Sequence, residues 1–138
     1  MISVPINLTE QEFQRLNALY PPTAKSSNVG GRSVELVQFY FRTIDPQCQF
    51  RVPNDGTDLV VTTGGATIQI EIKGTADTDI AWSKLKVSGN PSHQQLLNDV
   101  PLYRVVAVYD RAPTIHILKH SEDFEMNPEP RWSVKKRQ

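Results

Sequence analysis

The sequence predicts one α/β domain, in which helices flank a central mixed β-sheet. Residues 66–74 alternate isoleucine with polar side chains, which is typical of a strand with one buried face. Residues 103–110 form a continuous apolar run, which is typical of a central strand buried on both faces. A capped segment at 8–20 and an aromatic-rich segment at 32–43 are predicted to be helices.

The composition is that of an ordinary globular protein. The chain has 138 residues, of which 38% are hydrophobic and 22% charged, and no apolar run is long enough to cross a membrane. Its single cysteine, Cys48, excludes an internal disulfide and a cysteine zinc cluster. The start lacks the basic and apolar segments of a secretory signal. We therefore expect a cytoplasmic protein with no membrane partner.

The N-terminal third is expected to be helical. The helix at 8–20 begins with a Thr-x-x-Glu capping box at Thr9, and residues 23–31 are expected to form a polar loop. The second helix, 32–43, is rich in apolar and aromatic side chains, so much of it should be buried.

Glu35 lies inside this apolar helix. Burial of an unpaired carboxylate is costly, so a carboxylate at this position needs an explanation. The simplest one is that Glu35 points to solvent or pairs with Arg32 or Gln38.

A β-hairpin is expected where Gly64 and Gly65 follow the strand that Asp58 opens. Glu71 and Lys73 lie two residues apart on the returning strand, so their side chains share its polar face. Because the hairpin folds the chain back, its pairing can bring Asp58 near Glu71. An isolated Glu-x-Lys on a strand is common and indicates only a cross-strand charge pattern.

The rest of the chain is expected to complete the sheet. After a loop at 74–90, a helix begins at Pro91 or Ser92, and residues 114–120 form an edge strand beside the central one. The single domain is predicted to span residues 1–127, with its helical segment at 8–20 included. Residues 128–138 are basic and are predicted to be a disordered tail.

Asp58, Glu71 and Lys73 together predict a divalent-metal site. Two neighbouring carboxylates repel each other, and a hard cation such as Mg²⁺, which takes oxygen ligands, removes that cost. A lysine beside them can position or deprotonate a metal-bound water, while the metal stabilises charge on phosphate oxygens. Asp55 is a rival for the first acid, but its Asn-Asp-Gly setting indicates a turn.

An acid, a hairpin and then Glu-x-Lys on the second strand resemble the PD-(D/E)xK nuclease superfamily. Four motifs, in this order, are similar to its NO VEIN C-terminal-like branch: Gly30–Glu35, Gly56–Leu59, Ile70–Gly74 and Leu85–Ser88. The resemblance covers about residues 29–120. Thr57 stands where the name of the superfamily has proline.

This resemblance implies a restriction-endonuclease-like core and a Mg²⁺-dependent nuclease, with Mn²⁺ as a substitute. Asp58 and Glu71 would hold the metal, Lys73 would serve the attacking water, and Glu35 would complete the acidic cluster. The implied substrate is DNA, duplex or branched, in restriction, defence or DNA processing. A homodimer, or a larger restriction, repair or helicase complex, is also implied. Gln94 or Gln95 matches the glutamine that many such nucleases carry near the site.

Few basic residues are available to contact phosphates. Lys plus Arg equals Asp plus Glu at 15 each, so the net charge does not indicate a nucleic-acid partner. Arg51, Lys84, Lys86 and the basic tail are the candidates, although each taken singly is more simply a solvated surface charge.

Two other interpretations remain open. One is a catalytically inactive nuclease-fold module that binds nucleic acid or a protein partner. The other is an α/β domain whose Glu-x-Lys is accidental. Three acids kept together with a lysine favour the nuclease. No glycine-rich phosphate loop followed by Lys-Ser or Lys-Thr is present, so an NTPase is not expected.

Overall fold

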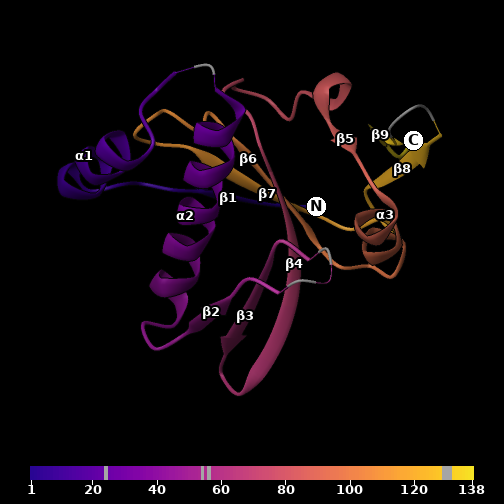
Figure 1. The fold of residues 1–138 in the computed structure, drawn as a ribbon, viewed down its shortest axis with the longest axis horizontal. Helices are drawn as coiled ribbons and strands as arrows, with labels where there is room; N and C mark the ends of the chain where they lie inside the picture. The colour runs from indigo at the N-terminus through magenta and orange to yellow at the C-terminus, as the bar shows by residue number, and fades with distance from the viewer. Residues whose placement is uncertain (24, 54, 56, 129–131) are drawn as a thin grey trace.

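The fold is organised around a six-stranded mixed β-sheet, with strand order β1-β7-β6-β4-β3-β2 (Figure 1). The computed structural model describes residues 1–138 except 24, 54, 56 and 129–131. Three strands form a second, smaller sheet in the order β5-β9-β8. In chain order the elements are β1 (Ile2–Pro5), α1 (Glu10–Leu19), α2 (Ser26–Ile44), β2 (Gln49–Arg51), β3 (Leu59–Thr63), β4 (Ala66–Gly74), η1 (Trp82–Lys84), β5 (Lys86–Val87), α3 (Asn90–Leu97), β6 (Leu102–Val106), β7 (Thr114–Leu118), β8 (Phe124–Asn127) and β9 (Trp132–Lys136).

The predicted hairpin is confirmed, and the central strand predicted at 103–110 is confirmed as far as Val106, after which the chain turns. Gly64 and Gly65 join β3 to β4 with φ angles of 56° and 80°, the left-handed conformation that a two-residue turn requires and glycine adopts without strain. All five residues of β6 are buried. This strand pairs in parallel with β4 and antiparallel with β7, so the sheet is mixed as expected.

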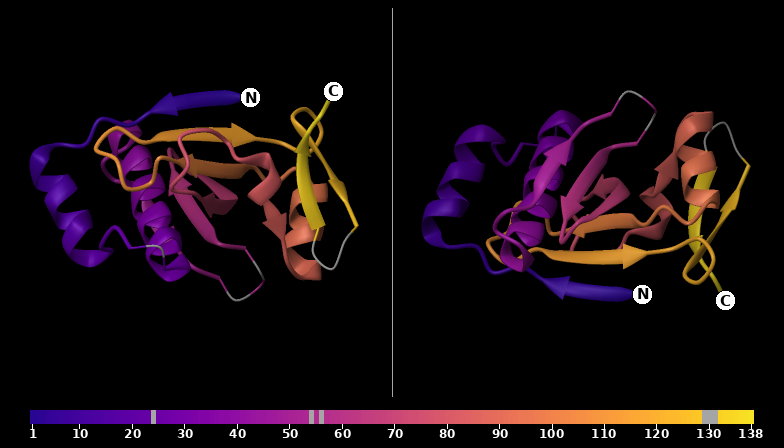
Figure 2. Two further views of the ribbon diagram at one scale, coloured as in Figure 1. Left: turned by 90° about the horizontal axis from the view of Figure 1, so that it is seen from above. Right: turned by 90° about the horizontal axis from the view of Figure 1, so that it is seen from below.

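Helices cover the two faces of the sheet unequally. α2 packs on one face over a core that includes Leu36, Ile72 and Val105. α3 and the small sheet enclose a second core with Leu102, from the opposite face of β6. Figure 2 shows α1 and α2 at one end of the molecule and α3 with the small sheet at the other. The observed architecture is therefore α/β, with helices on either side of a mixed sheet.

The helices begin where local capping and tertiary packing allow. α1 starts as predicted, because the Thr9 side chain accepts a hydrogen bond from the Glu12 backbone N–H at 3.1 Å. The predicted loop at 23–31 is wrong from Ser26 onward, because α2 already begins there. Gly31 lies inside this helix against the Tyr20 ring, where a Cβ would come within 2.2 Å of a ring carbon.

No helix among the described residues is both long and apolar enough to span a membrane.

Several strands lie where none was expected, among them β1, β8 and β9. β1 pairs with β7, so β7 is not the edge strand of the sheet. β9 pairs with both β5 and β8, so the prediction of a disordered tail is wrong for residues 132–136. Val134 of β9 is 1% exposed and belongs to the second core, and its burial explains why this basic segment is ordered. Arg131, which was part of the predicted tail, lies outside the described residues.

Candidate metal centre

Asp58 and Glu71 face each other across the hairpin. The β3–β4 register pairs Leu59 with Ile70, so one step further along the ladder Asp58 stands opposite Glu71. The Asp58 carboxylate is held in place by the Ile72 backbone N–H, which donates to Oδ2 at 2.8 Å. The predicted approach of the two acids is therefore present in the structure.

Glu71 carries a buried carboxylate with an unsatisfied oxygen. The residue is 2% exposed, and Oε1 has no hydrogen-bond partner among the described residues. Burial, followed by the negative charge of Asp58, raises the pKa of Glu71 well above its usual value. A buried polar atom without a partner costs about 1–3 kcal/mol, so this arrangement calls for a ligand.

Lys73 lies on the same face of β4 as Glu71. Its positive charge acts in the opposite direction to Asp58 and lowers the Glu71 pKa. On the neighbouring strand Lys73 is paired in register with Arg104. The structure therefore brings together the two acids and the lysine that the sequence predicts.

The polar face of β4 is exposed along its first half only. Thr67 and Gln69 are open to solvent, whereas Glu71 is buried and Lys73 is half-buried. The change coincides with the start of pairing to β6, where the Glu71 N–H donates to the Pro101 carbonyl at 3.0 Å. A pattern that would ordinarily indicate a solvated face thus ends in a buried charged site.

Glu35 does not join this group, contrary to the expectation. Its carboxylate pairs instead with Arg15 of α1, at 3.3 Å. On α2 it lies two residues from Ser33, which packs against Gly74, and two residues correspond to a rotation of about 200° around a helix. Glu35 therefore points away from the sheet. No three His, Cys, Asp or Glu side chains within the described ranges gather closely enough to hold a metal ion.

Asp55, the rival first acid, has a structural role. Its Oδ1 accepts a hydrogen bond from the Thr57 backbone N–H at 3.0 Å, an arrangement that closes a local turn. This bond from Thr57 also lowers the Asp55 pKa. Asp55 is exposed, so Asp58 is the acid that the fold presents to Glu71.

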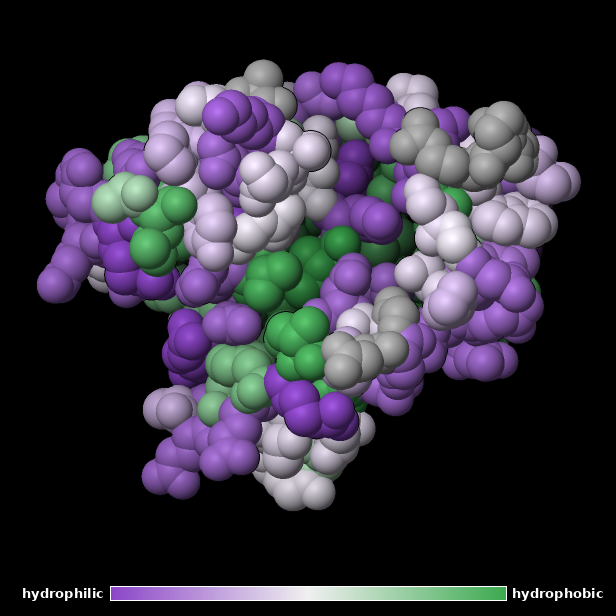
Figure 3. All heavy atoms as spheres, in the orientation of Figure 1, coloured by the Kyte–Doolittle hydropathy of each residue, from purple (hydrophilic) through white to green (hydrophobic). Residues whose placement is uncertain are grey.

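A pocket of about 490 Å³ adjoins the centre. Lys73, Lys84 and Arg104 line it, together with Ser26 and Gly30 from the start of α2. Figure 3 shows this face of the molecule hollowed at its centre, with a hydrophobic floor and hydrophilic side chains around it.

Arg104 is the functional candidate that the sequence analysis missed. It interrupts an apolar run, and an arginine in a central strand was a signal that could have identified it. The side chain is 3% exposed, and it donates from Nε to the Ile80 carbonyl at 2.9 Å and from Nη1 to the Gly74 carbonyl at 3.1 Å. Burial lowers its pKa to about 10, so it keeps its positive charge at neutral pH.

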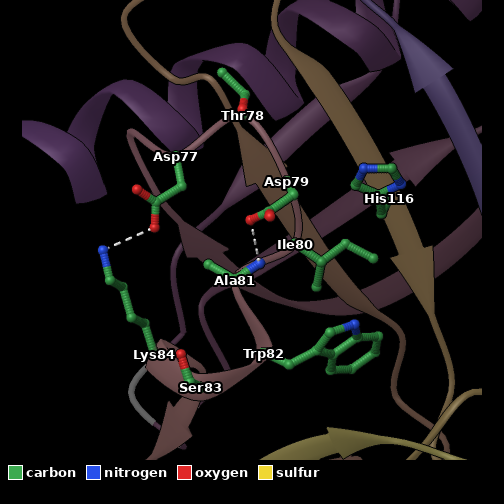
Figure 4. Close-up of a pocket in the computed structure, with 9 residues that line it drawn as sticks. All are labelled: Asp77, Thr78, Asp79, Ile80, Ala81, Trp82, Ser83, Lys84 and His116. Carbon is green, nitrogen blue, oxygen red and sulfur yellow. Dashed lines mark hydrogen bonds and ion pairs between the residues drawn. The ribbon is translucent and has the colours of Figure 1, made fainter.

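A second, larger pocket of about 860 Å³ lies beyond Lys84 (Figure 4). Asp77 and Asp79 line it on one side, and Trp82 and His116 line it on the other. Lys84 turns toward Asp77, with Nζ 2.8 Å from Oδ2. With two carboxylates in its wall, this pocket is less suited to an anion than the first.

The remaining predicted nucleic-acid contacts are dispersed. Arg51 is exposed on β2, Gln94 is exposed on α3, and Lys86 is half-buried on β5. None of these three lines either of the two pockets described above. Of the four predicted contacts, Lys84 alone lies at the candidate site.

Comparisons of this chain with protein-family models, with curated proteins and with solved structures find no match.

Proposed function

We propose that this chain is a metal-dependent nuclease that hydrolyses phosphodiester bonds in DNA, with a restriction-endonuclease-like core. Asp58, Glu71 and Lys73 form its active site. The observation that carries the proposal is the buried Glu71 oxygen, which lacks a partner and lies beside a second carboxylate. Strongly perturbed acids are typical of functional sites, and Lys73 of this group lines the adjoining pocket of about 490 Å³.

The two carboxylates fit a divalent cation. Mg²⁺ usually binds through one or two carboxylates and keeps several waters, so a third acid is not required. Asp58 and Glu71 would hold the ion, and Mn²⁺ would substitute for it. When bound, the ion supplies positive charge for the phosphate oxygens and a coordinated water.

The side chains around the ion have separate tasks. Asp58 is oriented by the Ile72 N–H, which donates to Oδ2, and its side chain also hydrogen-bonds with Glu71; a bound ion would take the place of the proton that the two acids share. The Lys73 ammonium would hydrogen-bond and orient the attacking water next to the phosphate. Burial of Glu71 restricts bulk water, which strengthens each charge interaction within the site.

A cleavage assay tests the proposal. Duplex, single-stranded and branched DNA and matching RNAs are incubated with and without Mg²⁺ or Mn²⁺. We expect metal-dependent cleavage of DNA that falls by at least about 100-fold in Glu71→Gln and in Lys73→Met. Gln69→Ala changes an exposed residue on the same face of β4 and should keep full activity. Cleavage that survives both active-site substitutions would show that the assignment is wrong.

A nuclease-fold module without catalysis is the second candidate. The position of Glu35 favours it, because the acidic cluster contains two acids instead of three. Such a module would bind DNA with the same affinity in EDTA and in Mg²⁺, and the metal would leave no heat signal in calorimetry.

A further inference from the structure

Three basic side chains line the pocket of about 490 Å³. Lys73 comes from β4, Lys84 from η1 and Arg104 from β6, and no Asp or Glu is among the described residues that line it. This set of side chains suits an anion and not a second metal ion.

The Arg104 guanidinium is fixed with one nitrogen available. Its bonds to backbone carbonyls use Nε and Nη1, and Nη2 has no hydrogen-bond acceptor among the described residues. A buried arginine held in this way loses little side-chain entropy when it binds an oxyanion. Arginine also presents paired donors that match phosphate geometry.

The start of α2 adds to the positive potential. The helix is 19 residues long, and its N-cap, Lys25, makes no side-chain capping bond. Ser26 and Gly30 from its first turns line the pocket. A Cβ added at Gly30 would meet nothing within 4 Å, so a ligand has room to approach this part of the helix. Because helix N-termini attract anions through free N–H groups and the helix dipole, the start of α2 favours an anion in the pocket.

The pocket and the metal centre share Lys73. Glu71 and Lys73 are two residues apart on one strand, a separation of about 6.6 Å. We propose that this pocket binds a phosphate group of the nucleic-acid strand, next to the phosphodiester bond that the metal centre cleaves. Arg104 and Lys84 are the phosphate-binding side chains, and Lys84, whose side chain is 66% exposed, would exchange its ion pair with Asp77 for the phosphate. That the phosphate belongs to a nucleic-acid strand rests on the proposed function, whereas the binding of an anion in this pocket does not.

Two serines in the first turn of α2 provide a matched test. Ser26 lines the pocket and Ser27 does not, and both are exposed. A glutamate at either position should keep the melting temperature, because an acid in the first turn of a helix is favourable. Binding of a fluorescein-labelled single-stranded DNA oligonucleotide is measured in EDTA by anisotropy at several salt concentrations. Inorganic pyrophosphate alone is titrated in parallel by calorimetry.

We expect Ser26→Glu and Lys84→Gln each to weaken oligonucleotide binding about tenfold, and Ser27→Glu to change it less than about twofold. Lys84→Gln should also reduce the salt slope by about one. Equal effects at the two serines, or no effect of Ser26→Glu and Lys84→Gln, would overturn the phosphate site even if the protein cleaves DNA. If pyrophosphate binds and the oligonucleotide does not, the ligand of the pocket is not a nucleic-acid strand. The expected binding changes without cleavage in any metal would refute the nuclease and leave the phosphate site standing.

Discussion

The two faces of the six-stranded sheet differ in what they bury. Beneath α2, Ile70 and Ile72 pack with Leu36 in an apolar core, and each is at most 8% exposed. On the opposite face Glu71 and Arg104 are buried just as deeply, at 2% and 3% exposure, and the carboxylate keeps an unpartnered oxygen. The α2 face thus stabilises the fold, while the other face combines the second core around Leu102 with a charged part, around Glu71 and Arg104, that gives up stability to hold charges in place. Substitutions on the two faces should therefore differ in their effects.

The largest loss of stability is expected on the α2 face. Leu36→Ala removes a fully buried side chain and should lower the free energy of unfolding by about 2–5 kcal/mol. Chemical denaturation measures this change. Leu19→Ala is the control, because Leu19 is 51% exposed and its truncation should change stability by less than about 0.5 kcal/mol. Equal losses of stability at the two leucines would show that burial beneath α2 does not determine the cost.

The opposite face should gain stability from a divalent ion. Mg²⁺ or Mn²⁺ at a hundredfold excess over its Kd should stabilise the native state by about 2.7 kcal/mol, because it neutralises the Asp58–Glu71 pair. Thermal melting detects this as a rise in Tm. The rise should be absent in Glu71→Gln and unchanged in Asp55→Asn. An equal rise in Glu71→Gln would place the ion elsewhere.

Gly74 lies where α2 crosses β4, so a substitution there tests how tightly α2 packs against the sheet. A Cβ at this position would come within 1.8 Å of Ser33 Oγ, so Gly74→Ala should cost about 1–3 kcal/mol. Adding Ser33→Ala should recover part of that loss. Gly30→Ala, where a Cβ meets nothing within 4 Å, should instead raise stability by up to about 1 kcal/mol. Urea titrations of the wild type, the two single glycine variants and the double variant measure these stabilities. Any other order of stability would contradict the packing described for Gly74.

The smallest effect, taken per pH unit, is a pH dependence of the charged face. In the native protein the Glu71 pKa rises from 4.5 to about 8, so between these values the folded state holds a proton that the unfolded chain has lost. In metal-free buffer this group should therefore lower the free energy of unfolding as pH increases from 4.5 to about 8, by at most about 1.4 kcal/mol per pH unit. Glu71→Gln should remove this component. A wild-type slope that persists in the variant would assign the titration to another group.

The sequence predicts the local parts of the molecule well. Gly64 and Gly65 specify a turn, the isoleucines of β4 specify a register, and together they bring Asp58 to Glu71. These features depend on residues that are neighbours or are joined by a short hairpin, so pattern and turn chemistry suffice.

The features that the sequence does not predict depend on distant partners. β1 is a strand because a segment far away in the chain supplies its hydrogen bonds. β9 pairs with the neighbouring β8, but it also pairs with the distant β5 and buries Val134 in the second core. The position of Glu35 depends on how α2 rotates over Gly74, which a helical pattern alone leaves undetermined. Likewise, the anion pocket requires Arg104 to lie beside Lys73 through parallel pairing of β4 with β6.

β1 has a consequence for how the protein folds. Ile2 pairs with Ile117, so the first strand finds its partner only after most of the chain has been synthesised. Closing so long a loop is entropically costly, and contacts between distant residues slow folding. The β6–β7 pair is nearly local and can form first. We therefore expect docking of β1 to be a late step in folding, during which the outer edge of β7 is exposed to pairing with other chains.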